Sequence, residues 1–445
     1  MFPNPQDSLP LPPKPSIERY RKIAKDLVNA CKSTDPGAIR AWADGWIQAL
    51  VKLSGPFAPE LPVRKRNWIN GVSAFAVRKF QDSSPSQRRC TLTGAQFVIA
   101  RSHGFESWPK FTKHLKALSR EDSSASRFEA AADAIVEGAE GSLGRLLREE
   151  PDLVHQHSER EHGAALLHYV SANGVEGYRQ KTPNNIVRIA EMLLDAGAEI
   201  DATTNVYGGQ WTTLGLAATS VHPERAGVQE PLLQILLDRG ADPNHPGIAG
   251  HGQSIVMACL ANGRPKAAEF LANHGAHLDL TGAAALGRLD VVKTHFTAQG
   301  SLTPGPTEAQ LMEGFLYACS NGSNNTVQFL LEKGIDMAGH SGDGQTGLHH
   351  AVIGGQLDTV KLLLRYNPPL EAENIYGGTV VGQALWSAAH HGDPAVYIEI
   401  LEALVAAGAK LHGRHIRVNT IVDEWLERHG SHAEPNWHWY GEEPD

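Results

Sequence analysis

The sequence predicts an all-α protein: a solenoid of about seven to eight helical repeats, some of them degenerate, that follows a small helical domain. A motif in which an aliphatic run ends in Gly-Ala recurs through the last two-thirds of the chain. The first 120 residues lack this motif, but their apolar residues also recur at helical spacing. With 41% hydrophobic and 20% charged residues, the composition is that of a globular protein rather than a disordered one.

Length and composition restrict the class of protein. A chain of 445 residues has room for two or three domains, or for one domain and a repeat array. No window holds the roughly eighteen consecutive apolar residues of a membrane span, and the proline-rich start lacks the apolar segment of a signal peptide. The four cysteines lie far apart without a CxxC pair, which predicts reduced thiols and no disulfide framework. We therefore expect a cytoplasmic protein.

Charge is distributed unevenly along the chain. Residues 1–120 carry 20 Lys and Arg against 8 Asp and Glu, a net charge of +12, whereas the rest carries a net charge of −21. This opposition favours docking of the basic segment on the acidic one. The alternative is that the basic runs at 63–68 and 87–90 contact nucleic acid. No nucleic-acid-binding motif accompanies them, so we expect no nucleic-acid partner.

The first 127 residues divide into three predicted parts. Residues 1–15 are proline-rich and predict an extended arm. Residues 16–119 predict a basic helical domain, in which Thr93 caps one helix and Ser107 opens the next. Residues 120–127 are rich in Ser and predict a linker to the repeats.

Each copy of the repeat motif ends in a residue suited to left-handed backbone. Seven copies are recognisable, and their terminal residues are spaced by 43, 35, 25, 34, 33 and 41 positions. Gly adopts a positive φ without steric cost and Asn tolerates it, so these positions predict the turn after a helix. The terminal residues are Gly197, Gly240, Gly275, Gly300, Gly334, Asn367 and Gly408.

The most regular copy, TGLHHAVIGGQLDTVKLLLRY at 346–366, resembles the ankyrin repeat. In that pattern Thr346 and His349 hydrogen-bond to one another and to the turn. The resemblance covers residues 128–415 and implies an ankyrin-repeat solenoid with hairpin-like finger loops between helix pairs. Residues 416–445 predict a capping helix followed by an acidic and aromatic tail.

Two further matches to this family bear on individual segments. His168 occupies the same place as His349, so the resemblance implies a structural role for both histidines. The segment TGAQFVIARSHGFESWPKF at 93–111 resembles a helical region that precedes the repeats in many bacterial ankyrin proteins. That second resemblance implies no known activity.

Three segments are longer than the repeat pattern requires: residues 175–185, 221–230 and 390–397. Long loops in compact repeats are uncommon and often functional, although surface insertions cost little and need no role. These segments are rich in Tyr, Arg, Gln, Glu and His, which favours binding. The candidate residues are Glu176, Tyr178, Arg179, Gln180 and His222, with His390 and His391 in the third segment.

Two predicted fingers, 205–215 and 374–382, share the motif Tyr-Gly-Gly. Tyr207 and Tyr376 stand where the family pattern has Asp, and the Gly pair suits positive-φ positions. A Tyr ring buries a large area with few rotatable bonds, which predicts contact with a partner; packing against neighbouring fingers is the alternative. Trp211 in the first finger is a further candidate.

Matching each repeat to the inner-helix pattern TPLHxA implies which side chains face the groove. The variable position x is assigned to Tyr169, Leu216, Tyr317, His350 and Ser387. Trp386 is assigned to the slot of the structural His. We expect Tyr169, Tyr317, His350 and Trp386 to be available for binding.

The sequence leaves chemical activity open. Glu176, Tyr178, Arg179 and His350 are the catalytic candidates, since catalysis needs a base held beside a nucleophile in a dry pocket. The motifs HExxH, GxSxG and the P-loop are absent. The adjacent histidine pairs lack the i, i+4 spacing of a helical metal site, so we expect no metal and no cofactor.

Two functions compete. The favoured hypothesis is an interaction module that binds a protein or peptide partner in its concave groove. The alternative is a site for a polar small molecule such as a carbohydrate, or a hydrolytic or transfer enzyme, formed by the Tyr-Gly-Gly fingers and the long loops.

Overall fold

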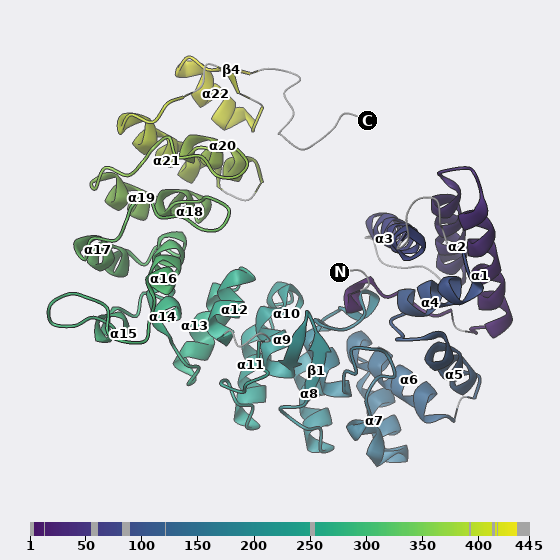
Figure 1. Cartoon of the computed structure of the whole chain (residues 1–445). Coiled ribbons are helices and arrows are strands. Elements are labelled where there is room, and N and C mark those ends of the chain that lie inside the picture. The colour runs from purple at the N-terminus through teal and green to yellow at the C-terminus, as the bar shows by residue number, and fades with distance from the viewer. Residues whose placement is uncertain are drawn as a thin grey trace. The chain divides into compact units, whose positions relative to one another are not determined.

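A computed structural model describes residues 4–12, 14–54, 61–81, 90–120, 122–249, 254–390, 393–411, 414–415 and 417–433 (Figure 1). The chain forms two compact units, Met1–Ala276 and His277–Asp445, called the first and the second unit below. The unit boundary thus lies inside the predicted repeat array rather than at the predicted linker.

The first unit begins with helices that pack around an aromatic core. Ser16 and Ser107 cap α1 and α5 by accepting the backbone N–H of Arg19 and Lys110. The prediction that Thr93 caps α4 is wrong, because Thr91 accepts the N–H of Gly94 instead. The helix α3 was not expected from the sequence. The helices are α1 (Ile17–Lys32), α2 (Ala38–Ser54), α3 (Leu61–Gln81), α4 (Leu92–Ser102) and α5 (Trp108–Leu118).

A disulfide joins Cys31, at the end of α1, to Cys90, just before α4, with a Cα–Cα distance of 5.8 Å. The prediction of no disulfide framework is therefore wrong. The two residues are 59 positions apart, and their contact follows from the packing of α1 against α4 rather than from sequence spacing. Cys259 and Cys319 are free and buried.

Helix pairs follow, and the described residues contain eight of them. The first unit holds four: α6 (Ser124–Glu137) with α7 (Glu140–Glu149), η3 (Leu166–Ser171) with α8 (Ile186–Asp195), α9 (Thr213–Thr219) with α11 (Gln229–Asp238), and α12 (Ile255–Ala261) with α13 (Pro265–Asn273). The second unit holds four more: α14 (Leu280–Ala285) with α15 (Leu289–Thr294), α16 (Glu308–Ser320) with α17 (Asn324–Glu332), α18 (Gly347–Ile353) with α19 (Leu357–Leu364), and α20 (Val380–His390) with α21 (Pro394–Ala406).

The predicted turns and structural histidines are confirmed. All six terminal glycines have φ between 82° and 99°, and Asn367 has φ 54°. Thr346 Oγ1 lies 2.9 Å from His349 Nδ1, and His349 Nε2 lies 3.2 Å from the carbonyl oxygen of Gly378. His168 makes the equivalent contacts with the N–H of Ala165 and the carbonyl of residue 202.

Strands are short. A hairpin forms between β1 (Thr203–Val206) and β2 (Gly209–Thr212), while single bridges close three other fingers. A second, parallel pair joins β3 (Arg414–His415) to β4 (His432–Ala433) near the capping helix α22 (Thr420–Arg428). The acidic and aromatic tail beyond residue 433 lies outside the described residues.

Two of the long predicted loops contain helix. Residues 221–230 form α10 (Val221–Arg225) and the start of α11, and residues 390–397 fall mostly in α20 and α21. His391 lies outside the described residues. The helix α6 begins at Ser124, inside the predicted linker. The remaining elements are the 3-10 turns η1 (Pro5–Asp7), η2 (Pro151–His155) and η4 (Gly177–Arg179).

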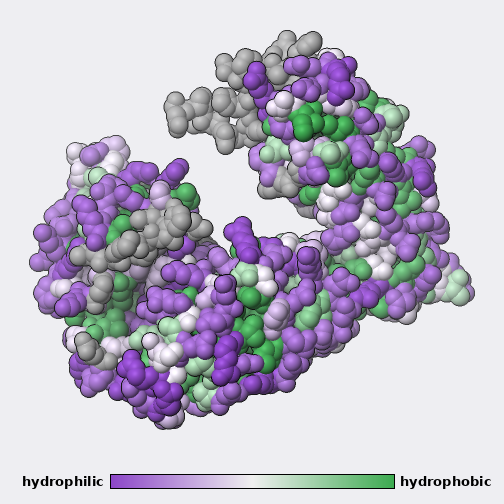
Figure 2. All heavy atoms as spheres, turned by 180° about the vertical axis from the view of Figure 1, so that it is seen from behind, coloured by the Kyte–Doolittle hydropathy of each residue, from purple (hydrophilic) through white to green (hydrophobic). Residues whose placement is uncertain are grey.

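Polar side chains cover most of the face of the molecule that Figure 2 shows, and hydrophobic residues are visible in patches between them. Among the described residues no helix is long and apolar enough to cross a membrane.

Candidate functional site

The first long segment, residues 172–185, is a folded element rather than an exposed loop. After η3 the chain turns through Ala172 (φ 48°) and Gly174 (φ 69°), and then forms η4. Glu176 and Arg179 are buried, whereas Tyr178 and Gln180 are half-buried. Gln180 donates its side-chain N–H to the carbonyl of Val175.

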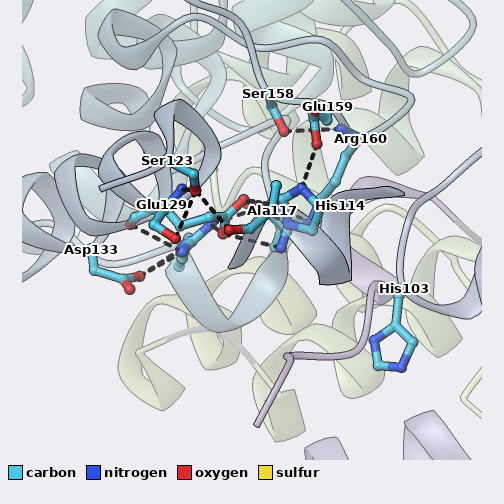
Figure 3. A network of polar contacts seen from close by, with 12 residues as sticks. His103, His114, Ala117, Ser123, Glu129, Asp133, Ser158, Glu159 and Arg160 are labelled. Carbon is cyan, nitrogen blue, oxygen red and sulfur yellow. Dashed lines mark hydrogen bonds and ion pairs between the residues drawn. The ribbon is translucent and has the colours of Figure 1, made fainter. Parts of the chain in front are cut away.

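Glu176 and Arg179 belong to a buried cluster of ion pairs, part of which Figure 3 shows. Arg160 makes a bidentate pair with Glu129 of α6, at 2.5 and 3.2 Å, and its Nε lies 2.9 Å from Glu176. Arg179 lies 2.8 Å from Glu129 and 2.7 Å from Asp133. The segment is thus tied to α6 through charged groups.

The charges of this cluster stabilise one another. Burial alone opposes ionisation of Glu129, but Arg160 and Arg179 outweigh it and lower its pKa to about 2. The same balance holds the pKa of Glu176 well below its usual range. Burial raises the pKa of Tyr178, whose hydroxyl lies 3.3 Å from Arg160. At neutral pH both carboxylates are therefore ionised and paired, which suits a structural contact better than a general base.

The same segment holds the N-terminal helices against the repeats. The side chain of Arg64, on α3, donates a hydrogen bond of 2.9 Å to the carbonyl oxygen of Gly177. A Cβ at Gly177 would lie 2.4 Å from the carbonyl oxygen of Gln6, so only glycine allows the arm and η4 to lie this close. His114 Nδ1 of α5 lies 2.6 Å from the carboxylate of Glu159, the residue directly before Arg160 (Figure 3).

The structure therefore corrects the expectation that Glu176 and Arg179 are free for binding, because both are buried in ion pairs. Tyr169 was expected in the groove, but its side chain is 0% exposed and packs between Phe128 and the guanidinium group of Arg179. Leu216 is also fully buried, and a Cβ added at Gly174 would lie 3.0 Å from its side chain. The segment packs on the inner helix α9, where the Asn173 side chain donates a hydrogen bond of 3.2 Å to the carbonyl oxygen of Leu216.

The first finger uses its Tyr to close the turn. Tyr207 (φ 53°) and Gly208 (φ 79°) are the two turn residues, so the expected positive-φ Gly pair is replaced by Tyr-Gly. The Tyr207 hydroxyl donates to Asn173 Oδ1 at 2.7 Å and accepts the N–H of Gly174 at 3.2 Å. Trp211 is buried and forms an edge-to-face pair with the Tyr207 ring at 6.1 Å.

A cavity of about 200 Å³ lies between this finger, the N-terminal arm and the end of α4. An ion pair between Arg101 and Glu161 lies at its edge. Its lining includes Asn4, Ser8, His162 and Asn205. The catalytic candidates Glu176, Tyr178 and Arg179 do not line it.

In the second unit two of the expected groove residues remain accessible. Tyr317 of α16 and His350 of α18 hold equivalent places and are half-buried. Burial lowers the pKa of His350 to about 4 despite the nearby Asp343, so its ring is neutral at physiological pH. Burial and then Glu313 raise the pKa of Tyr317.

The inner-helix pattern fits α20 in two registers, because this helix has 11 residues and α18 has 7. Counted from the capping residues Thr346 and Thr379, Gln383 corresponds to His350, and Gly382 occupies the slot of the structural His. Counted from the helix ends, Ser387 corresponds to His350, and Trp386 occupies that slot. Trp386 is half-buried and stacks on His390 at 4.6 Å.

The second Tyr-Gly-Gly finger folds differently from the first. Asn374 Oδ1 accepts the N–H groups of Tyr376 and Gly378, and Gly377 supplies the positive φ of 72°. The Tyr376 ring is therefore released from the turn. Ile375 is 66% exposed and Tyr376 is 70% exposed. Ile375 was not among the residues predicted from the sequence, although an Ile beside a Tyr is an unusual composition for a turn.

The remaining candidates are dispersed. His222 lies half-buried in α10, where its backbone N–H donates to the side-chain hydroxyl of Ser220. Within the described ranges no group of three or more His, Cys, Asp or Glu residues lies close enough together to hold a metal ion.

The stacked helix pairs, most of them followed by a left-handed residue, define a helical repeat protein. Residues 315–414 match the family model of ankyrin repeats (3 copies), which identifies this part of the chain as ankyrin repeats. Ankyrin repeats are in general protein–protein interaction modules.

Solved structures with similarity to this chain include two ankyrin repeat domains. That of Bcl-3, described as a unique member of the IkappaB protein family, is 18% identical with a TM-score of 0.30, over 61% of this chain and 97% of that one. That of human ASB11 is 19% identical with a TM-score of 0.33, over 63% of this chain and 99% of that one.

Proposed function

We propose that the protein is an interaction module that binds a protein or peptide partner on the inner-helix and finger face of its second unit. The observation that carries this proposal is the exposure of Ile375 and Tyr376, the two most exposed large hydrophobic side chains of the described residues. Large apolar side chains held in water at the tip of an ordered turn are typical anchors of a protein interface.

Neighbouring positions support the same face. Ile375 donates its backbone N–H to the carbonyl of Asp343 in the preceding finger at 2.9 Å, so adjacent fingers form a continuous edge. Tyr317 and His350 add half-buried polar and aromatic groups on the inner helices. In the first unit the corresponding positions, Tyr169 and Leu216, are covered by the chain itself.

The alternative function gains no support from the long loops. A polar small-molecule or enzymatic site there would need accessible groups, and Glu176 and Arg179 are buried in ion pairs. Because the inner-helix positions of the first unit are buried by the chain itself, we expect a partner to contact the exposed side chains of the second unit.

A photo-crosslinking experiment tests the proposal. A photoreactive aromatic residue is placed at position 376, and the matched control places it at 361, an exposed site on the outer helix α19. We expect a protein adduct in cells from position 376 only, lost when Ile375→Ser is added. Equal adducts from both positions, or none from 376, would contradict the proposal.

The cytoplasmic location expected from the sequence is part of this proposal. The Cys31–Cys90 disulfide is the observation that opposes it, because cytosolic thiols are normally kept reduced. Alkylation of thiols in intact cells decides the matter. Labelling of Cys31 and Cys90 supports the cytoplasm, and their protection contradicts it.

A further inference from the structure

In residues 289–379 of the second unit, positive charge is confined to the outer row of helices. The inner helices α14, α16, α18 and α20 pack one on the next, as do the outer helices α15, α17, α19 and α21 (Figure 1). All four Lys and Arg residues of this stretch lie on the outer helices or at their C-terminal caps: Lys293, Lys333, Lys361 and Arg365.

The inner helix α16 and the finger segments 334–346 and 366–379 carry only negative charge. Together they hold six carboxylates and no Lys or Arg. These residues, called the acidic face below, are Glu308, Glu313, Asp336, Asp343, Glu371 and Glu373.

The negative charge of the acidic face is not neutralised within the described part of the chain. None of its six carboxylates lies within ion-pair distance of a described Lys or Arg, whereas the first unit pairs many of its carboxylates. The Asp343 carboxylate accepts the Ser341 hydroxyl, and the carboxylates of Asp336 and Glu371 accept backbone N–H groups at 2.9 and 2.8 Å. Burial and the nearby Asp279 raise the pKa of Glu313, as expected for a carboxylate that lacks a cation.

The exposed apolar pair lies within this face. Ile375 and Tyr376 follow Glu371 and Glu373 in the same finger, and the Ile375 N–H bonds the backbone of Asp343. An apolar anchor is thus flanked by unpaired carboxylates on its own finger and on the preceding one.

We propose that the acidic face binds a cationic segment of a partner protein, one that carries Lys or Arg on both sides of a large apolar side chain. This inference rests on the proposed function and names the chemistry of the partner. Apolar burial against Ile375 and Tyr376 supplies the anchor, and charge complementarity supplies the choice of partner. Acidic segments and nucleic-acid phosphates are repelled by the same carboxylates.

Fluorescence anisotropy with three labelled peptides tests this chemistry on the full chain. The first peptide contains Lys, Leu and Ser, the second has Glu in place of Lys, and the third has Ser in place of Leu. We expect the first peptide to bind most tightly, and its affinity to fall as salt is added. The third peptide lacks the apolar side chain that serves as the anchor, and the carboxylates of the acidic face repel the second peptide.

Two matched variants locate the effect. Glu313→Gln, Asp343→Asn and Glu373→Gln together remove three charges from the acidic face. Asp290→Asn, Glu332→Gln and Asp358→Asn remove three from the outer helices α15, α17 and α19. We expect the first triple variant to bind the Lys-Leu peptide about tenfold more weakly, and the second to change binding by less than about twofold. Circular dichroism and thermal unfolding establish that both variants remain folded.

The outcomes separate this inference from the proposed function. Equal loss in both triple variants, tighter binding of the Glu peptide, or binding of none of the peptides overturns the cationic partner. Crosslinking from position 376 is judged independently of these peptides. An adduct there with a partner that lacks a basic segment preserves the proposed function and overturns the inference alone.

Discussion

Arg160 and Glu129 form a bidentate ion pair inside the first unit, at 2.5 and 3.2 Å, with the Arg160 side chain 1% exposed. Glu129 lies on α6, whereas Arg160 lies in the loop before η3. Glu176 and Arg179 attach the long segment to the same pair. One buried cluster thus holds three separate stretches of the chain together.

Breaking this pair is expected to cost more stability than breaking a surface pair. Glu129→Gln leaves Arg160 and Arg179 short of a buried counter-charge, so the free energy of unfolding should fall by about 3 kcal/mol or more. The matched control is Glu191→Gln, which removes an exposed pair with Arg188 and should cost less than about 1 kcal/mol. Urea unfolding measures both, and equal losses would show that the cluster is not a major structural contact.

Gly177 is expected to be required for docking of the N-terminal arm. Gly177→Ala places a methyl group 2.4 Å from the backbone of Gln6, which cannot move aside as a flexible side chain would. Protease cleavage within residues 4–12 should become faster as the arm detaches. The control is Gly141→Ala on helix α7, where the added Cβ would have no neighbouring atom within 4 Å, and it should leave cleavage unchanged. Unchanged cleavage in the Gly177 variant would rule out the close contact.

The disulfide is expected to stabilise the first unit. Closing a loop of 59 residues restricts the unfolded chain, and Cys31→Ser should lower the free energy of unfolding by about 4 kcal/mol. Thiol titration of the unfolded purified protein should give two free thiols without reductant, from Cys259 and Cys319, and four after reduction. Four thiols without reductant would mean that the bond does not form.

Buried neutral histidines predict a loss of stability in mild acid. Burial lowers the pKa of His168 to about 4 and that of His103 to about 3, against a usual value of 6.5. The unfolded chain therefore binds protons first, so stability is full above pH 6.5 and falls as pH decreases toward the folded pKa values.

The size of this effect is open to measurement. At pH 5 each such histidine should cost about 2 kcal/mol relative to pH 7.5, as read from urea midpoints. Glu129 adds a separate loss only below about pH 4.5, since its folded pKa is about 2. Stability that stays constant from pH 7.5 to 5 would contradict burial of these histidines in the neutral form.

Local features were predictable because they depend on the residue itself. The positive φ of Gly197 and Asn367 follows from backbone sterics, and the Thr346–His349 contact follows from a spacing of three residues at a helix start. The register of α20 was not predictable in this way. This helix has 11 residues where α18 has 7, so a match to the pattern depends on which end of the helix is aligned.

The two Tyr-Gly-Gly fingers could be recognised in the sequence, but the different ways in which they fold could not. Tyr207 and Tyr376 share a motif, yet the first ring is held by Asn173, which lies 34 residues earlier and outside the motif. Ile375 and the segregation of charge around it became visible only when residues 289–379 could be sorted into inner and outer helices.

The sequence by itself determined the repeats, their turns, their structural histidines and the opposition of charge between the two parts of the chain. Tertiary structure alone decided that Glu176 and Arg179 are buried, that Cys31 meets Cys90, and that Ile375 is left in water. The physical reason is range. Backbone preference and helical period act over a few residues, whereas burial and ion pairing depend on which distant segments pack together.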